Sequence, residues 1–249
     1  MSLQDDLALA LARIGVAIDK LDNVDAKTTA AIAQVVATYQ ARLSTLVTTF
    51  YISGGGSDAA LGTTPATPLR TLAEASRRTP VGGFCRSLLQ TAIEITEDVE
   101  LLNKHMVVGT ADSTQRTLLF NRRATNTVPS YRSVAGFFFM GRSSLVLNNL
   151  FIAMPELSAE YNNTTPNYAA SPFRPQGGDH GVMQSLTFNG CTIAFPNTLF
   201  SPLTASINFL YANGCVISGS PNGKWVDGYG ASAGTSPANL PLITNLATI

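Results

Sequence analysis

An internal repeat in the second half of the chain most strongly limits the fold that it can adopt. The sequence NGCTI at 189–193 returns as NGCVI at 213–217, 24 residues later. The segment 148–152 (NNLFI) has the same form, and 103–107 (NKHMV) is a looser copy. A short apolar run precedes each copy, so the repeating unit is a strand, an Asn or Gly corner and a second strand.

A unit of this length cannot bury its own apolar face, and stacking successive units solves that problem. We therefore expect a mainly β chain that forms a parallel β-helix with coils about 4.8 Å apart. Asn and Gly suit the corners because both tolerate left-handed backbone angles, and equivalent Asn side chains can stack into a hydrogen-bonded ladder. A β-sandwich with NG hairpin turns is the alternative, but its repeats would not keep one corner at a near-constant spacing.

The N-terminal segment 1–48 contains no Pro, is rich in Ala, Leu, Val and Ile, and predicts helix. An apolar heptad seam runs along it in alternating steps of four and three: Leu7, Leu11, Ile14, Ile18, Leu21, then Ile32, Val35 and Tyr39. Asp25 and Thr28 interrupt the seam, so a kink or a turn is expected over 23–28. The seam needs a partner, and we favour a parallel oligomeric stalk over two helices packed on their own domain.

Charge and composition restrict the partners. Lys plus Arg number 16 and Asp plus Glu number 16, so the net charge is zero, which argues against nucleic acid or a membrane surface as the main partner. No run approaches the ~18 apolar residues of a membrane span, and the first 25 residues lack a basic leader segment. Cys85, Cys191 and Cys215 lack CxxC spacing, so we expect reduced thiols, no metal site and no cofactor.

The stretch 50–75 reads FYISGGGSDAALGTTPATPLRTLAEA and carries a distinctive order of elements. An aromatic-x-Ile-Ser strand is followed by Gly-Ser-Asp, a Gly/Pro loop and an amphipathic helix. The matching residues are Tyr51, Ile52, Ser53, Gly56, Ser57, Asp58, Gly62, Pro65, Pro68, Leu69, Thr71, Leu72 and Ala75. This opening resembles that of the pectate-lyase-like right-handed β-helix proteins, which include many bacteriophage tailspikes and tail fibres.

The resemblance implies a right-handed parallel β-helix over 50–220, with the helix at 69–78 capping its first coil. It divides the chain into an N-terminal helical, coiled-coil-like trimerisation or attachment segment at 1–49, the β-helix, and a Gly/Pro-rich C-terminal cap at 221–249. Fibres and tailspikes of this layout are homotrimers. The resemblance therefore implies a virion protein of the tail, baseplate or head appendage, made in the host cytoplasm and attached to other virion proteins through its N-terminal helix.

A long polar insertion at 155–181 is the candidate binding surface, because loops on a rigid solenoid often hold binding sites. Aromatic rings there could stack on sugars of a host surface polysaccharide, while carboxylates and Arg bind hydroxyls. The candidate residues are Glu156, Glu160, Tyr161, Tyr168, Arg174, Asp179 and His180. The alternative is that the insertion packs between subunits of an oligomer.

No catalytic residue is predicted. Glycan cleavage needs paired carboxylates, and the acids after residue 112 are Glu156, Glu160, Asp179 and Asp227, none of them on a repeat strand. The acidic cluster at 94–100 is predicted as a solvated face and His105 as a packed histidine. We therefore expect a structural fibre or spike that acts in host-surface adhesion or particle architecture. The alternative is a tailspike-type polysaccharide depolymerase, which would be either a hydrolase or a lyase.

Overall fold

The computed structural model describes residues 3–121, 134–154, 171–175, 183–194, 207–218, 236 and 242–246. The chain divides after Thr45 into two compact units. Six of the seven candidate binding residues in the insertion lie outside the described residues: Glu156, Glu160, Tyr161, Tyr168, Asp179 and His180.

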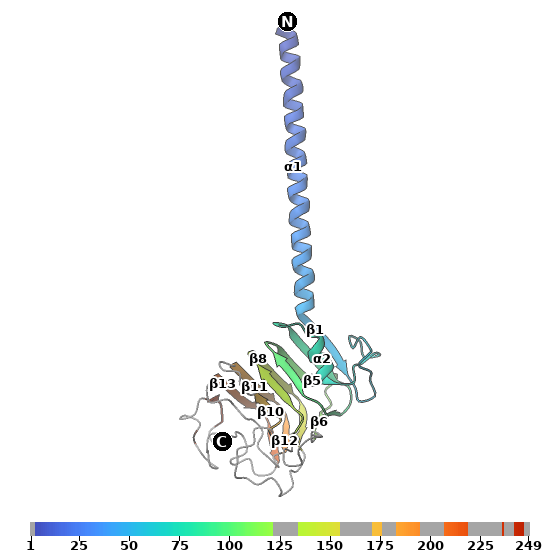
Figure 1. Ribbon diagram of the computed structural model, residues 1–249, viewed down its shortest axis with the longest axis vertical. Helices are drawn as coiled ribbons and strands as arrows, with labels where there is room; N and C mark the ends of the chain where they lie inside the picture. Colours follow the sequence, from blue (N-terminus) through green and yellow to red (C-terminus); the bar gives the residue numbers. More distant parts are fainter. Residues whose placement is uncertain are drawn as a thin grey trace, which may run out of the picture. The chain divides into compact units, whose positions relative to one another are not determined.

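The first unit is a single α-helix, α1 (Leu3–Leu46), of 44 residues, drawn without a break in Figure 1. The kink expected over 23–28 is therefore wrong. Neither Asp25 nor Thr28 removes a backbone N–H as Pro would, and the Thr28 hydroxyl donates to the carbonyl oxygen of Val24 at 2.8 Å, so its polar group is satisfied within the helix. In the part of the chain that the structure describes, no helix has both the length and the apolar character needed to cross a membrane.

The second unit is mainly β and consists of three sheets whose strands all pair in parallel where the structure describes them. The largest sheet has the order β1 (Val47–Ile52), β2 (Phe84–Leu89), β5 (His105–Thr110), β8 (Arg142–Asn148), β11 (Met183–Asn189), β13 (Ile207–Asn213) and β15 (Leu242–Thr244). A second sheet orders β14 (Val216–Ser218), β12 (Thr192–Ala194), β9 (Leu150–Ala153), β6 (Arg116–Phe120) and β3 (Ile93–Ile95). The third orders β10 (Phe173–Pro175), β7 (Phe137–Met140) and β4 (Val99–Leu102).

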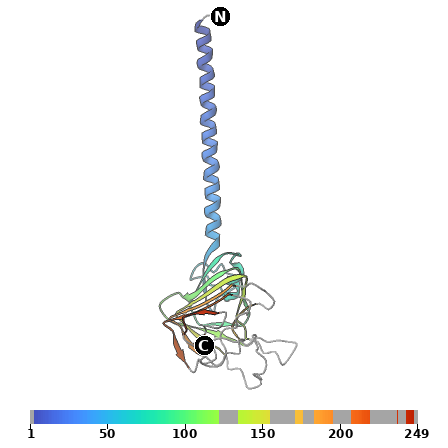
Figure 2. The same cartoon turned by 90° about the vertical axis from the view of Figure 1, so that its left-hand side faces the viewer.

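From β2 to β11 the chain visits the three sheets in a fixed rotation, for example from β5 to β6, β7 and then β8. Figure 1 shows strands of the largest sheet side by side, in chain order from β1 to β13. Figure 2 shows the same unit turned by 90°. A β-sandwich has antiparallel sheets, so that alternative does not fit the described strands. The arrangement is compatible with a β-helix-like fold, in which we call one passage through the sheets a coil.

Side chains that point inward form a core shared by all three sheets. Four of its phenylalanines pack against one another: Phe120, Phe137, Phe173 and Phe188, each fully buried. Phe137 and Phe173 stack with ring centroids 5.7 Å apart, and Phe120 and Phe188 meet Phe173 edge-on at 5.2 and 5.6 Å. Such contacts add to area burial, so the phenylalanine cluster ties adjacent coils together.

The asparagine ladder expected at the corners is confirmed. Asn189 pairs in register with Asn148 and Asn213, and its side-chain amide donates to the Asn148 Oδ1 at 2.9 Å. Asn213 donates to Asn189 at 3.1 Å, and Asn245 extends the ladder by donating to Asn213 at 3.1 Å. The residue after each of the first three ladder positions has positive φ: Asn149 at 54°, Gly190 at 60° and Gly214 at 60°.

The assignment of Asn103 to this corner is wrong. Asn103 (φ 49°) links β4 to β5, a different corner, where it stacks on Gly141 (φ 64°). Its Oδ1 accepts the backbone N–H of Arg142 at 2.8 Å. A Cβ added at Gly141 would lie 2.2 Å from that Oδ1, so glycine is required at this position by the close approach as well as by φ.

Two expected boundaries also change. The strand β15 pairs with β13, with Thr244 opposite Leu210, so the largest sheet continues beyond the end expected at residue 220. The insertion at 155–181 contains a strand, β10, which pairs with β7. The insertion is therefore partly a structural element of the third sheet.

Candidate functional site

A cavity of about 480 Å³ lies in the second unit beside the short helix α2 (Leu72–Arg78). Five carboxylates line it: Asp58, Glu74, Glu97, Asp98 and Glu100. Arg77 and Lys104 are the cations of its lining. We call this cavity the acidic pocket, and which of its charged groups are free for a ligand depends on the bonds that each one makes within the chain.

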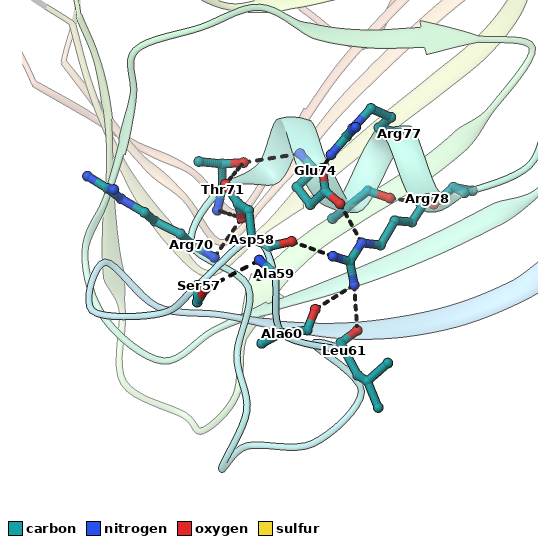
Figure 3. Close-up of polar contacts among 12 residues, drawn as sticks. Ser57, Asp58, Ala59, Ala60, Leu61, Arg70, Thr71, Glu74, Arg77 and Arg78 are labelled. Atoms are coloured by element: carbon teal, nitrogen blue, oxygen red, sulfur yellow. Dashed lines mark hydrogen bonds and ion pairs between the residues drawn. The ribbon is translucent and has the colours of Figure 1, made fainter.

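Asp58 is a structural residue of the loop that precedes α2. Its Oδ1 accepts the backbone N–H groups of Arg70 and Thr71, both at 2.9 Å, and its Oδ2 accepts the Thr71 hydroxyl at 3.0 Å. Thr71 is the N-cap of α2 and accepts the N–H of Glu74 at 3.1 Å (Figure 3). Asp58 thus fixes the start of the helix, which explains the Gly-Ser-Asp pattern in the sequence.

The same loop requires two glycines. A Cβ at Gly56 would lie 2.5 Å from the carbonyl oxygen of Leu69, and Gly62 has φ +76° with the Leu69 side chain 2.5 Å from its Cβ position. Leu69 is fully buried. These glycines therefore allow the loop to close over a core residue.

Glu74 is also engaged within the chain. Its carboxylate forms ion pairs with Arg77 and with Arg78, the latter at 2.5 Å. The Arg78 guanidinium reaches from α2 to the loop, where it donates to the carbonyl oxygens of Ala60 at 2.6 Å and Leu61 at 3.2 Å (Figure 3). Asp58, Glu74 and Arg78 together hold α2 against the loop, and none of them is free to act on a ligand.

Replacing Asp58 by alanine should destabilise the second unit by about 1–3 kcal/mol, because two N–H groups and one hydroxyl lose their common acceptor. Urea unfolding followed by circular dichroism measures the change. Ser57→Ala is the matched control, because the hydroxyl of exposed Ser57 accepts one long hydrogen bond, from the N–H of Ala59 at 3.3 Å, and its loss should change stability by less than about 0.5 kcal/mol. Equal effects of the two variants would contradict this role for Asp58.

Among the described residues, Glu97 and Glu100 make no side-chain hydrogen bond or ion pair, and Lys104 makes one hydrogen bond. Glu97 and Glu100 are exposed. The Lys104 ammonium is buried and donates to the carbonyl oxygen of Ser76 at 2.7 Å. Burial lowers the pKa of Lys104, while Cys85 and Glu100 act in the opposite direction. The pocket can thus offer carboxylate acceptors beside the Lys104 cation, a set that suits the hydroxyl groups of a sugar.

Arg174 is the one candidate residue of the insertion that the structure describes, and it is 1% exposed. Its guanidinium donates to the carbonyl oxygens of Val134 and Ser171, both at 2.7 Å, and pairs with Asp98 at 3.3 Å. It also lies 4.3 Å from the ring centroid of Phe138. Arg174 therefore acts inside the fold, which corrects its expected place on a binding loop.

The acidic cluster at 94–100 was expected to form a solvated face, but its members differ in exposure and in bonding. Glu94, Glu97 and Glu100 are exposed, whereas Asp98 accepts the N–H of Gly136 at 3.3 Å and pairs with Arg174. Along β4, exposed Glu100 alternates with the buried Val99 and Leu101. Its place beside α2 depends on contacts between distant segments, and no local signal could have revealed the pocket.

His105 is exposed rather than packed, which corrects the expectation for it. Its Nδ1 lies 2.7 Å from the Ser144 hydroxyl on the neighbouring strand. A serine beside a histidine has the spacing of a nucleophile and its base, but that chemistry also needs a group that orients the histidine. No hydrogen bond to the other His105 ring nitrogen occurs among the described residues, so we assign the pair no catalytic role.

The three cysteines are free thiols. Burial raises the pKa of Cys85, and the adjacent Cys215 thiol together with burial raises that of Cys191. The adjacent Cys191 thiol lowers the pKa of the half-buried Cys215 to about 6. The expectation of reduced thiols stays a prediction, and the lowered pKa and partial exposure of Cys215 lead us to expect that it reacts fastest.

Iodoacetamide at pH 7 should therefore modify Cys215 at least on the order of ten times faster than Cys85 or Cys191, which are each 1% exposed. Because the pKa of Cys215 lies below 7, its rate should fall as the pH drops below about 6. Peptide mass spectrometry of briefly treated protein gives the three rates, with the unfolded chain as the control. A disulfide between Cys191 and Cys215 in freshly made protein, or equal rates for the three thiols, would contradict this assignment.

Within the described residues, no three side chains of the His, Cys, Asp and Glu types gather closely enough to form a metal cluster. Comparison with known proteins adds no relative from which a role could be transferred: no protein-family model, curated protein or solved structure matches this chain.

Proposed function

We propose that the chain is a structural fibre or spike protein of a bacteriophage particle, which forms a homotrimer and acts in host-surface adhesion or particle architecture. The exposed apolar seam of α1 is the observation that carries this proposal. Leu11, Ile14, Ile18 and Leu21 are 52–68% exposed, and Ile32 and Val35 continue the seam at 59% and 67%. Contiguous apolar surface of this kind marks an interaction site.

The spacing of the seam favours other copies of α1 as its partner. Alternating steps of four and three residues place these side chains on one stripe that matches a parallel coiled coil. Fully burying one Leu or Ile contributes about 1.5–3 kcal/mol, so several layers of three side chains could hold a trimer together. The choice of three copies rests on the resemblance to phage fibres and tailspikes, which also supports the virion setting.

For the second unit we propose a right-handed parallel β-helix. The fixed rotation through three parallel sheets supports this proposal, and connections between parallel strands of one sheet are right-handed in almost all proteins. Asp58, Thr71 and Arg78 form the hydrogen bonds that hold α2 against the preceding loop. Asp58 and Thr71 belong to the stretch 50–75, on which the resemblance to that family rests. The cap helix would protect the first strands from edge pairing.

A tailspike-type polysaccharide depolymerase is the second candidate, and the acidic pocket is the observation that favours it. Glu97 and Glu100 lie in one cavity with Lys104, and paired carboxylates are what glycan hydrolysis uses. We favour adhesion because Asp58, Glu74 and Asp98, the other carboxylates of the pocket, are bound within the fold.

Incubation of the purified full chain with bacterial surface polysaccharides distinguishes the two functions. The adhesion proposal expects binding without an increase in reducing ends or unsaturated sugar. Depolymerisation that is abolished by Glu97→Gln or Glu100→Gln, or by Glu156→Gln or Asp179→Asn in the insertion, would establish the enzyme instead. Asp112→Asn is a control, because Asp112 pairs with Arg116 outside the pocket.

A further inference from the structure

Two cysteines occupy equivalent positions on adjacent coils. Asn189 is opposite Asn213 and Thr192 is opposite Val216, so the register places Cys191 directly beside Cys215. The backbone N–H of Val216 donates to the carbonyl oxygen of Cys191 at 2.8 Å, which holds the two backbones together at this point. Two thiols are thus stacked by the repeat itself.

The two sulfur atoms also have equivalent surroundings. Cys191 Sγ lies 3.3 Å from the carbonyl oxygen of Leu147, and Cys215 Sγ lies 3.6 Å from that of Phe188. Leu147 and Phe188 are themselves opposite each other in β8 and β11. The two thiols therefore differ by one step of the coil repeat, and their sulfur atoms should lie about 4.8 Å apart.

This spacing suits a bridging metal ion better than a disulfide. A disulfide needs sulfur atoms about 2.05 Å apart with a dihedral angle near 90°, whereas parallel Cβ directions separate them by a whole strand spacing. With the zinc–thiolate length of about 2.3 Å as a guide, two metal–thiolate bonds placed in line span about 4.6 Å. Thiolates are the ligands that soft ions such as copper(I) prefer.

We propose that Cys191 and Cys215 bind one soft monovalent metal ion, of the copper(I) or silver(I) class, between their sulfur atoms in a linear two-coordinate site. Each thiol loses its proton to solvent, and each sulfur donates an electron pair to the ion, so no atom changes its oxidation state. Cys191 is 1% exposed, but Cys215 is only half-buried, which gives the ion a route from solvent. This site is independent of the proposed function of the chain.

Silver(I) is the probe, because it is not reduced or oxidised in the test. The full chain is titrated with silver nitrate in chloride-free buffer, with calorimetry for affinity and native mass spectrometry for stoichiometry. We expect one tightly held silver ion per chain. Cys215→Ser and Cys191→Ala should each weaken its binding by on the order of 10²-fold or more, because one of two linked ligands is lost. Cys85→Ser is the matched control and should leave this ion in place, since Cys85 lies on β2, away from the pair.

Circular dichroism verifies that each variant is folded, and Cys215→Ser is the decisive one because its side chain is half-buried. Unchanged silver affinity in folded Cys215→Ser would overturn the proposal. Three ions of similar affinity, one for each cysteine, would also overturn it. X-ray absorption of the silver-loaded chain should give two sulfur neighbours, and a single sulfur neighbour would contradict a shared site.

Discussion

Replacing Ile18 and Ile32 by aspartate should convert the proposed trimer into monomers. Both residues lie on the seam of α1 and are 52% and 59% exposed in the single chain. In a trimer each position would place three carboxylates in one apolar layer. Each layer would lose the burial of three isoleucines, about 5–9 kcal/mol, and would gain charge repulsion as well. Analytical ultracentrifugation over a range of protein concentrations measures the change in association.

Val16 provides the control for this experiment. It is 54% exposed, close to Ile18, but lies off the seam on the same helix. Val16→Asp should therefore leave the association state unchanged. Dissociation by Val16→Asp to the same extent as by the double variant would show that the seam is not the contact surface.

Phe173→Ala should be the most destabilising single change in the second unit, at about 3–5 kcal/mol. Phe173 is fully buried and contacts the rings of Phe120, Phe137 and Phe188, so its removal leaves a cavity where the sheets meet. Thermal unfolding followed by circular dichroism measures the loss.

Phe84→Ala makes the same chemical change on an outward-facing position. Phe84 is 38% exposed, so its replacement should cost less than about 1 kcal/mol. A loss for Phe173→Ala no larger than that for Phe84→Ala would show that the phenylalanine cluster does not stabilise the core.

The corner ladder could be predicted because the repeat places an Asn side chain at the same point of successive coils, and stacking the coils brings these side chains together. NG at 189 and 213 places an acceptor and a donor at the same point of each coil, and the bonds between Asn148, Asn189 and Asn213 follow. Asn103 was misassigned because another corner of the coil also needs left-handed backbone angles. Sequence alone does not distinguish two corners that have the same conformational requirement.

The parts that could not be predicted depend on contacts between distant residues. Arg174 was read as a loop residue from its polar neighbours, but it is buried by bonds to Val134 and Asp98, 40 and 76 residues away. The acidic pocket likewise combines the loop at Asp58 with Glu100 on β4. In α1, the two polar seam positions suggested a break that helix propensity alone does not require.

The molar mass of the unmodified full chain in solution tests the account most directly. Light scattering coupled to size-exclusion chromatography should give about 79 kDa, three times the 26.3 kDa of one chain. This mass should persist on dilution into the low micromolar range and at high salt, because the seam is apolar. A stable 26.3 kDa monomer of the folded full chain would contradict the stalk, and with it the proposal of a trimeric fibre.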